Sequence, residues 1–153
     1  MPPETNLFEL QFLLDELPLL AGDYLKRRTR RSGFSYSTAD TIAFCAGRKI
    51  KEGDRSKDNL KKIFAWKNSD DYRWWDKLER DFDKNTPDAI EKALTVAVEA
   101  DDGVVAIKAL TELYGVGVPT ASAILATIHP ERYTVIDQLA LRGVGIDDPP
   151  IAF

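Results

Sequence analysis

The sequence has little of the chemistry that builds disulfide frameworks and metal cages. Its 153 residues include one cysteine, Cys45, and one histidine, His129. A single cysteine excludes a disulfide within the chain. A zinc site would have to be built mostly from carboxylates, which suit harder cations better. We therefore predict no covalent cross-link and no structural metal.

Long apolar segments are also missing. The longest uncharged stretch, residues 113–128, is too short to cross a bilayer and is interrupted by two glycines and a proline. The N-terminus, Met1-Pro2-Pro3-Glu4, lacks the basic region and apolar run of a secretory signal, so we expect no membrane contact and a reducing, cytoplasmic location. Hydrophobic residues make up 44% of the chain and charged residues 30%, which is typical of a globular protein with one core.

The negative charge is unevenly distributed. The formal net charge is −4, but residues 1–67 carry 13 basic and 9 acidic residues, whereas residues 68–153 carry 8 and 16. This balance argues against a protein that coats nucleic acid over its whole surface, so a contact with a polyanion must be local. The densest basic run could clamp phosphates or could be a solvated connector; it comprises Lys26, Arg27, Arg28, Arg30 and Arg31.

Apolar residues recur at helical spacing along the chain, and no sustained two-residue alternation marks a strand. We therefore predict an all-α bundle of about seven helices. Residues 1–36 should form an N-terminal helix, with an apolar stripe over residues 7–17 that Pro18 interrupts, followed by the basic connector. Residues 37–153 should form a helical domain that makes one compact unit with the first helix.

Capping residues predict where the later helices begin. Ser37 or Thr38 should cap a helix that ends near Gly47, and Ser56 and Ser69 should each begin another. Thr86 precedes Pro87, a favoured first helical residue. One more helix should run over residues 104–113, and the four apolar positions that follow it at helical spacing should belong to the next: Ala121, Ile124, Leu125 and Ile128.

The most informative segment is the connection between these last two helices, Tyr114-Gly115-Val116-Gly117, which is followed at once by Pro119. Two glycines permit a very tight turn, and their missing side chains let a ligand approach the backbone. The second helix presents unpaired N–H groups and the positive end of its dipole at that turn. The segment therefore predicts a phosphate cradle that needs no lysine.

This segment resembles the helix-hairpin-helix DNA glycosylase superfamily, whose members carry a Leu-x-Gly-Val-Gly-x-x-Thr-Ala hairpin and, further on, an aliphatic residue followed by aspartate. Asp137 follows Gly117 by 20 residues, which is the spacing of the family when no insertion intervenes. The resemblance is clear over residues 110–142 and fainter back to about Leu60. The matching residues are Leu113, Gly115, Val116, Gly117, Thr120 and Ala121, then Val135, Ile136 and Asp137.

The resemblance implies a DNA-binding helix-hairpin-helix protein that acts in base repair. Gly115, Val116, Gly117 and Thr120 would lie at a phosphate of duplex DNA, often with a monovalent cation at the hairpin carbonyls and with no other cofactor. Asp137 would be the catalytic carboxylate, facing a nucleotide turned out of the duplex. It would stabilise positive charge on the sugar and activate water, so that the base is released.

Two departures from the family pattern bear on the chemistry. Lytic members have a lysine nucleophile where this chain has Pro119, so an enzyme of this kind would be a monofunctional hydrolase without lyase activity. The chain also stops 16 residues after Asp137, whereas the glycosylases generally continue through further helices. The alternative is a non-catalytic helical module, derived from this fold, that binds DNA or another protein.

Structural roles are open for most of these residues. The turn could be a compact helix junction, and Asp137 could be the N-cap of a following helix. Trp75 should pack in the core, whereas Trp74 lies off the apolar stripe and could stack on a base. Cys45 should be a small buried hydrophobe, and His129 should cap the end of a helix.

Overall fold

The computed structural model describes residues 36–68, 75–143 and 145. Two compact units divide the chain, Met1–Asp40 and Thr41–Phe153, and the packing described below is that of the second unit. The predicted N-terminal helix, the basic run at residues 26–31 and Trp74 lie outside the described residues.

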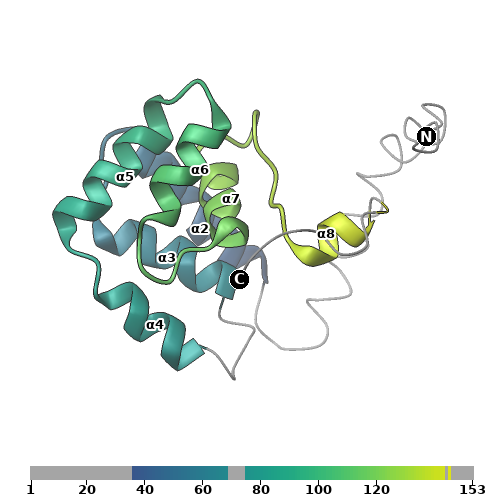
Figure 1. Ribbon diagram of the computed structural model, residues 1–153, viewed down its shortest axis with the longest axis horizontal. Helices are drawn as coiled ribbons and strands as arrows, with labels where there is room; N and C mark the ends of the chain where they lie inside the picture. The colour runs from purple at the N-terminus through teal and green to yellow at the C-terminus, as the bar shows by residue number, and fades with distance from the viewer. Residues whose placement is uncertain (1–35, 69–74, 144, 146–153) are drawn as a thin grey trace. The chain divides into compact units, whose positions relative to one another are not determined.

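The described residues contain seven helices and no strand, which confirms the all-α class (Figure 1). None of these helices is both long and apolar enough to cross a membrane. In chain order they are α2 (Tyr36–Lys51), α3 (Lys57–Asn68), α4 (Trp75–Asp83), α5 (Pro87–Glu99), α6 (Gly103–Thr111), α7 (Val118–Ile128) and α8 (Gln138–Gly143).

Side-chain caps begin two helices where the sequence predicted, whereas α2 already begins at Tyr36, before the predicted caps Ser37 and Thr38. The hydroxyl of Thr86 accepts the N–H of Ala89 at 3.2 Å at the start of α5, and Pro87 is the first helical residue. The hydroxyl of Ser56 accepts the N–H of Asn59 at 3.4 Å before α3. Local hydrogen bonding therefore accounts for these boundaries.

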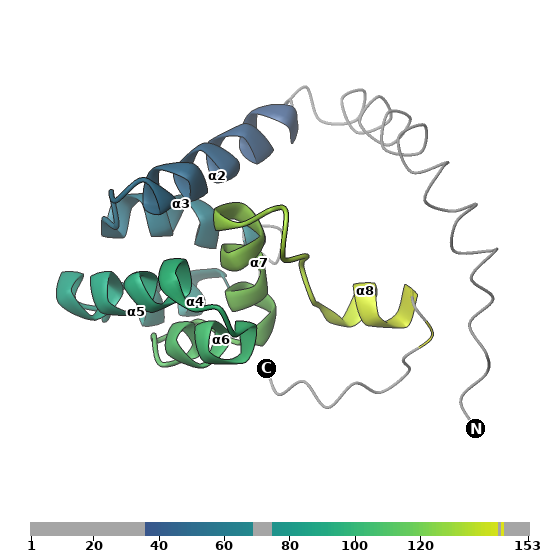
Figure 2. The ribbon, with the colours of Figure 1, turned by 90° about the horizontal axis from the view of Figure 1, so that it is seen from above.

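Helix α7 is the centre of the fold. Every residue from Thr120 to Ile128 is buried, so the predicted apolar stripe is covered and so is the opposite face. Figure 2 shows α2 and α3 on one side, α5 and α6 on the other, and α7 running from one side to the other. A helix that is apolar or small all round can be buried in this way, because no face requires water.

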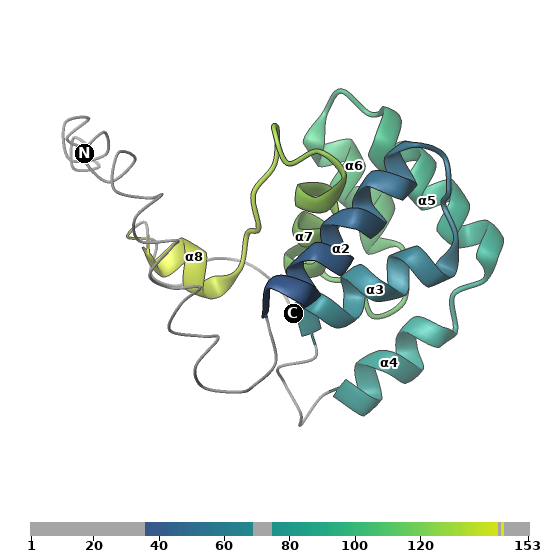
Figure 3. The ribbon, with the colours of Figure 1, turned by 180° about the vertical axis from the view of Figure 1, so that it is seen from behind.

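Helix α2 does not end near Gly47, so that prediction is wrong. The helix continues to Lys51. It passes across α7 in Figure 3, and Gly47 is the residue of α2 that lies against Thr127 of α7. A Cβ atom at Gly47 would lie 2.7 Å from the Cβ of Thr127 and would overlap the carbonyl of Thr127. Glycine is present here because two helix backbones approach closely, and it does not terminate the helix.

The remaining expectations have mixed outcomes. Trp75 packs against the core, with its ring 5.9 Å from that of Phe64, as predicted. Cys45 is partly exposed and not buried. His129 follows the last residue of α7, and its Nε2 lies 3.1 Å from the carbonyl oxygen of Val98 in α5, so the imidazole caps a neighbouring helix and not its own.

Candidate nucleic-acid interface

A compact turn over residues 112–117 joins α6 to α7. It is closed by two backbone hydrogen bonds, from the N–H of Leu113 to the carbonyl of Leu110 at 3.1 Å and from the N–H of Val116 to the carbonyl of Leu113 at 3.2 Å. The side chains of Leu113 and Val116 are buried in the core, whereas Tyr114 is exposed. The turn is therefore anchored in the core by Leu113 and Val116, while the side chain of Tyr114 lies at the surface.

Asn85 holds this turn from outside the segment. Its side-chain NH₂ donates to the carbonyl of Tyr114 at 2.9 Å, and its Oδ1 accepts the N–H of Tyr114 at 2.9 Å. The same NH₂ donates to the carbonyl of Phe82 at the end of α4. Asn85 is 4% exposed, so its buried amide is satisfied by these bonds and fixes the turn against α4. Sequence reasoning missed Asn85, because no local pattern relates it to a turn 29 residues away.

The two glycines of the turn have different surroundings. Gly115 has a left-handed φ of 77°, and a Cβ atom there would lie 3.2 Å from both the carbonyl oxygen of Leu78 and the nitrogen of Phe82. Its missing side chain therefore makes room for α4. Gly117 is extended, with φ −89° and ψ 179°, and among the described residues a Cβ atom there would meet only the Cδ of Pro119, at 3.7 Å. We refer to this uncovered side as the open face of Gly117.

The N-terminus of α7 begins at this open face. Gly117 is the N-cap residue, and no side chain of the part of the chain that the structure describes caps the helix. The predicted partner Thr120 is 5% exposed, and its hydroxyl lies 3.4 Å from both polar atoms of the Asn68 amide in α3. Four residues were predicted to meet a phosphate. The side chains of Val116 and Thr120 are buried, and Gly115 lies against α4. Gly117 is the member of this set whose backbone is left uncovered by the described residues.

Ser122 connects the first turn of α7 to the segment that carries the candidate carboxylate. Its hydroxyl accepts the N–H of Ile136 at 2.8 Å and donates to the carbonyl of Pro119 at 2.8 Å. Ile136 is therefore tied to the start of α7, and Asp137 is the next residue. The structure thus places Asp137 directly after a residue that is hydrogen-bonded to the first turn of α7.

Both carboxylate oxygens of Asp137 have partners. Oδ1 accepts the N–H of Ala140 at 2.8 Å, which makes Asp137 the cap of α8. Oδ2 accepts a hydrogen bond from the ammonium of Lys67 at 2.9 Å, and the two side chains are 27% and 21% exposed. The capping interpretation of Asp137 is confirmed. Lys67, at the end of α3, was missed because it precedes Asp137 by 70 residues.

The other lysines of α3 also have partners. Lys57 donates to the carbonyls of Asp83 and Asn85, both at 2.9 Å, and Lys62 pairs with Asp58 at 2.6 Å. The ammonium of Lys61 hydrogen-bonds to Glu79 at 3.1 Å, and this bond raises the pKa of Lys61. Lys61, Lys62 and Lys67 are thus paired with acidic side chains, whereas Lys57 donates to neutral carbonyls.

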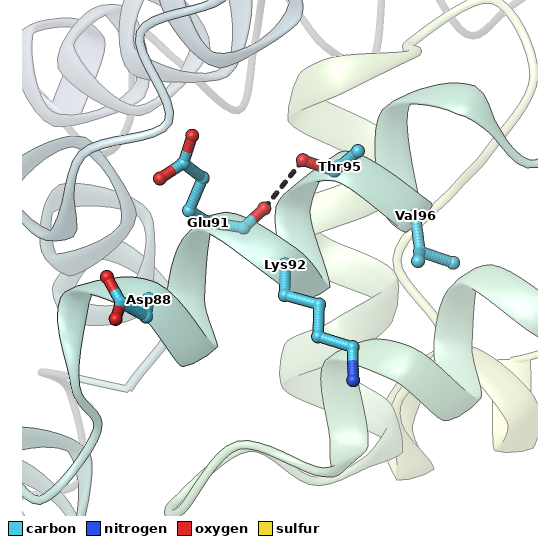
Figure 4. A pocket seen from close by; sticks show the side chains of 5 residues that line it. All are labelled: Asp88, Glu91, Lys92, Thr95 and Val96. Atoms are coloured by element: carbon cyan, nitrogen blue, oxygen red, sulfur yellow. Dashed lines mark hydrogen bonds between the residues drawn. The ribbon is translucent and has the colours of Figure 1, made fainter.

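A cavity of about 340 Å³ lies elsewhere, along one side of α5 (Figure 4). All of its lining residues belong to that helix, and none of them belongs to the turn or to the Asp137 segment; they are Asp88, Glu91, Lys92, Thr95 and Val96. Within the described part of the chain, no three His, Cys, Asp or Glu side chains converge on a metal position.

Comparison of the chain with protein-family models, with curated proteins and with solved structures gives no match. The class that the described residues define is an all-helical protein whose central helix starts at a glycine turn.

Proposed function

We propose that this chain binds DNA through a backbone phosphate at the turn between α6 and α7. The observation that supports this most strongly is the open face of Gly117 at the uncapped N-terminus of α7. Helix N-termini attract anions, because their first N–H groups have no partner within the helix and the dipole is positive there. The resemblance of residues 113–121 to the glycosylase hairpin supports the same contact.

Local charge is compatible with an anion at this position. Asp137, which lies beside α7, is paired with Lys67 at 2.9 Å. A phosphate at the turn would therefore find the charge of Asp137 already paired, and the exposed carboxylate of the turn itself is that of Glu112. If a monovalent cation bound at the turn, the carbonyl of Tyr114 would have one lone pair left for it, because the other accepts the amide of Asn85.

For catalysis, the proposed role is monofunctional release of a base, with Asp137 as the carboxylate. The carboxylate would stabilise the positive charge that develops on the sugar and orient a water molecule. In the structure the ammonium of Lys67 occupies Oδ2, so a substrate would have to displace it. The second candidate function is a non-catalytic DNA- or protein-binding module, and the occupation of both oxygens of Asp137 favours it.

The phosphate contact can be tested with two matched alanine variants. Gly117→Ala adds a methyl group to the open face, whereas Gly143→Ala adds one at a glycine with nothing within 4 Å. We expect the first variant to bind a short labelled duplex at least about tenfold more weakly, since hydrogen bonds to a charged group are lost. The second variant should bind like the wild type, and wild-type binding should weaken steeply as salt rises.

Fluorescence anisotropy at low and moderate salt provides the measurement. Equal affinities of Gly117→Ala and the wild type would refute the phosphate contact. Absence of DNA binding by the wild type, even at low salt, would refute the function as a whole.

The chemistry can be tested with duplexes that carry uracil, oxidised bases or alkylated bases, followed by alkali to cleave at abasic sites. Asp137→Asn keeps a capping oxygen for α8 but removes the charge, so the fold should persist. We expect this variant to lose base release while it retains DNA binding. Unimpaired base release by the variant would refute the catalytic role of Asp137. If the wild type released no base from any of these duplexes, the non-catalytic binding module would be the remaining function.

A further inference from the structure

Tyr114 is an exposed aromatic residue at the tip of the turn. It is 62% exposed, more than the other exposed large apolar side chains, which include Val104 at 58%. Within the described residues its side chain makes no ring contact and no hydrogen bond, and its bonds are those of its backbone. Its ring therefore adds nothing to the core, although aromatic rings are among the largest apolar groups available for burial.

The backbone that carries this ring is held from both sides. The buried amide of Asn85 binds the N–H and the carbonyl of Tyr114, both at 2.9 Å. The next residue, Gly115, has the left-handed conformation that closes the turn, and its Cα faces the backbone of α4. Only the two side-chain torsions of Tyr114 would be lost when the ring is buried by a partner. An aromatic side chain on a backbone that is already fixed therefore loses little conformational entropy on binding.

Tyr114 also lies close to the proposed phosphate contact. Gly117 is three positions further along the chain, so their Cα atoms are at most about 11 Å apart even if the chain between them were fully extended. Adjacent bases and phosphates of one strand lie within the same range. A phosphate at the open face of Gly117 would thus bring a neighbouring nucleotide within reach of the phenol ring.

We infer that the face of Tyr114 stacks on an unpaired base beside the phosphate bound at Gly117, so that the site prefers single-stranded or locally unpaired DNA to an intact duplex. In an intact duplex both faces of each base are covered by its neighbours, and the ring would meet only sugar and phosphate. An unpaired base offers a free face, and stacking on it is independent of sequence. This inference rests on the proposed phosphate contact and specifies the class of ligand.

The test compares three variants on two labelled probes, a short oligothymidine and the same strand paired with oligoadenine. Tyr114→Ala removes the ring, Tyr114→Phe keeps it, and Val104→Ala removes an equally exposed apolar side chain from the far end of α6. We expect Tyr114→Ala to bind the single strand about 5- to 150-fold more weakly, the effect of removing one base-stacking aromatic. The other two variants should bind within about twofold of the wild type.

The two probes distinguish base stacking by Tyr114 from the proposed phosphate contact at Gly117. The loss for Tyr114→Ala should be larger on the single strand than on the duplex, and its thermal unfolding should match the wild type because the ring is exposed. Unchanged single-strand affinity, or equal losses on both probes, would overturn base stacking. If Gly117→Ala still weakened binding in that case, the phosphate contact would stand alone. Absence of binding to either probe by the wild type would remove both.

Discussion

The two ends of α7 use glycine in opposite ways. Near the C-terminal end, Gly47 of α2 lies against Thr127 with no space for one further carbon atom. At the N-terminal end, Gly117 has space beside it and no side-chain cap. Both residues are small, yet one permits two helices to pack and the other leaves a helix terminus uncovered. Their difference shows that the role of a glycine depends on what occupies the space its missing side chain leaves.

The largest effect is expected at the packed end. Gly47→Ala should lower the free energy of unfolding by about 3 kcal/mol, because the methyl group overlaps the carbonyl of Thr127 and forces α2 away from α7. The gain in helix propensity, about 1 kcal/mol, is too small to offset this. Urea unfolding followed by circular dichroism measures the change. A variant as stable as the wild type would show that the helices do not cross this closely.

The next effect separates the two glycines of the turn itself. Gly115→Ala should cost about 2 kcal/mol, because alanine is strained at a left-handed φ and its Cβ would press on α4. Gly117→Ala is the matched control and should change stability by less than about 0.5 kcal/mol, since its φ is ordinary and its side is open. Similar losses in the two variants would contradict the difference drawn between them.

A smaller effect is expected at the ion pair beside the uncovered end. Lys67→Met should cost about 1 kcal/mol at most, because the pair with Asp137 is partly exposed. A double-mutant cycle with Asp137→Asn isolates the pairwise term, and Asn retains the cap of α8. Zero coupling would mean that Lys67 and Asp137 do not interact in solution.

The smallest effect concerns α4, which covers Gly115. Hydrogen bonds from Lys77 and then Lys84 lower the pKa of Asp81 from 3.8 to about 2. Since the folded pKa is below the ordinary value, the stabilisation is complete above pH 3.8 and is lost as pH falls towards 2. Thermal unfolding should therefore place Asp81→Asn slightly below the wild type at pH 6, with a clearly smaller difference at pH 2, where half of the native Asp81 is protonated. A constant difference between pH 6 and pH 2 would contradict the shifted pKa.

Sequence reasoning located most of the described helices, because the signals it uses are local. The cap at Thr86 and the apolar spacing of Ile124, Leu125 and Ile128 involve residues within two turns of each other. The prediction was wrong at Gly47. A glycine after an apolar run is typical of a helix end, but here it allows α2 to pack closely against α7, which is distant in the sequence. The prediction for Cys45 was also wrong. Its neighbours in the sequence are small or apolar, yet its side chain is partly exposed.

The sequence by itself determined the all-helical class, the glycine turn before α7 and the candidate carboxylate, because periodicity, capping and turn residues act over a few positions. Only the tertiary structure decided that α4 covers Gly115 and leaves Gly117 open, and that Lys67 pairs with Asp137 from 70 residues away. Contacts between distant segments depend on how whole helices pack together, and a short stretch of chain does not contain that information.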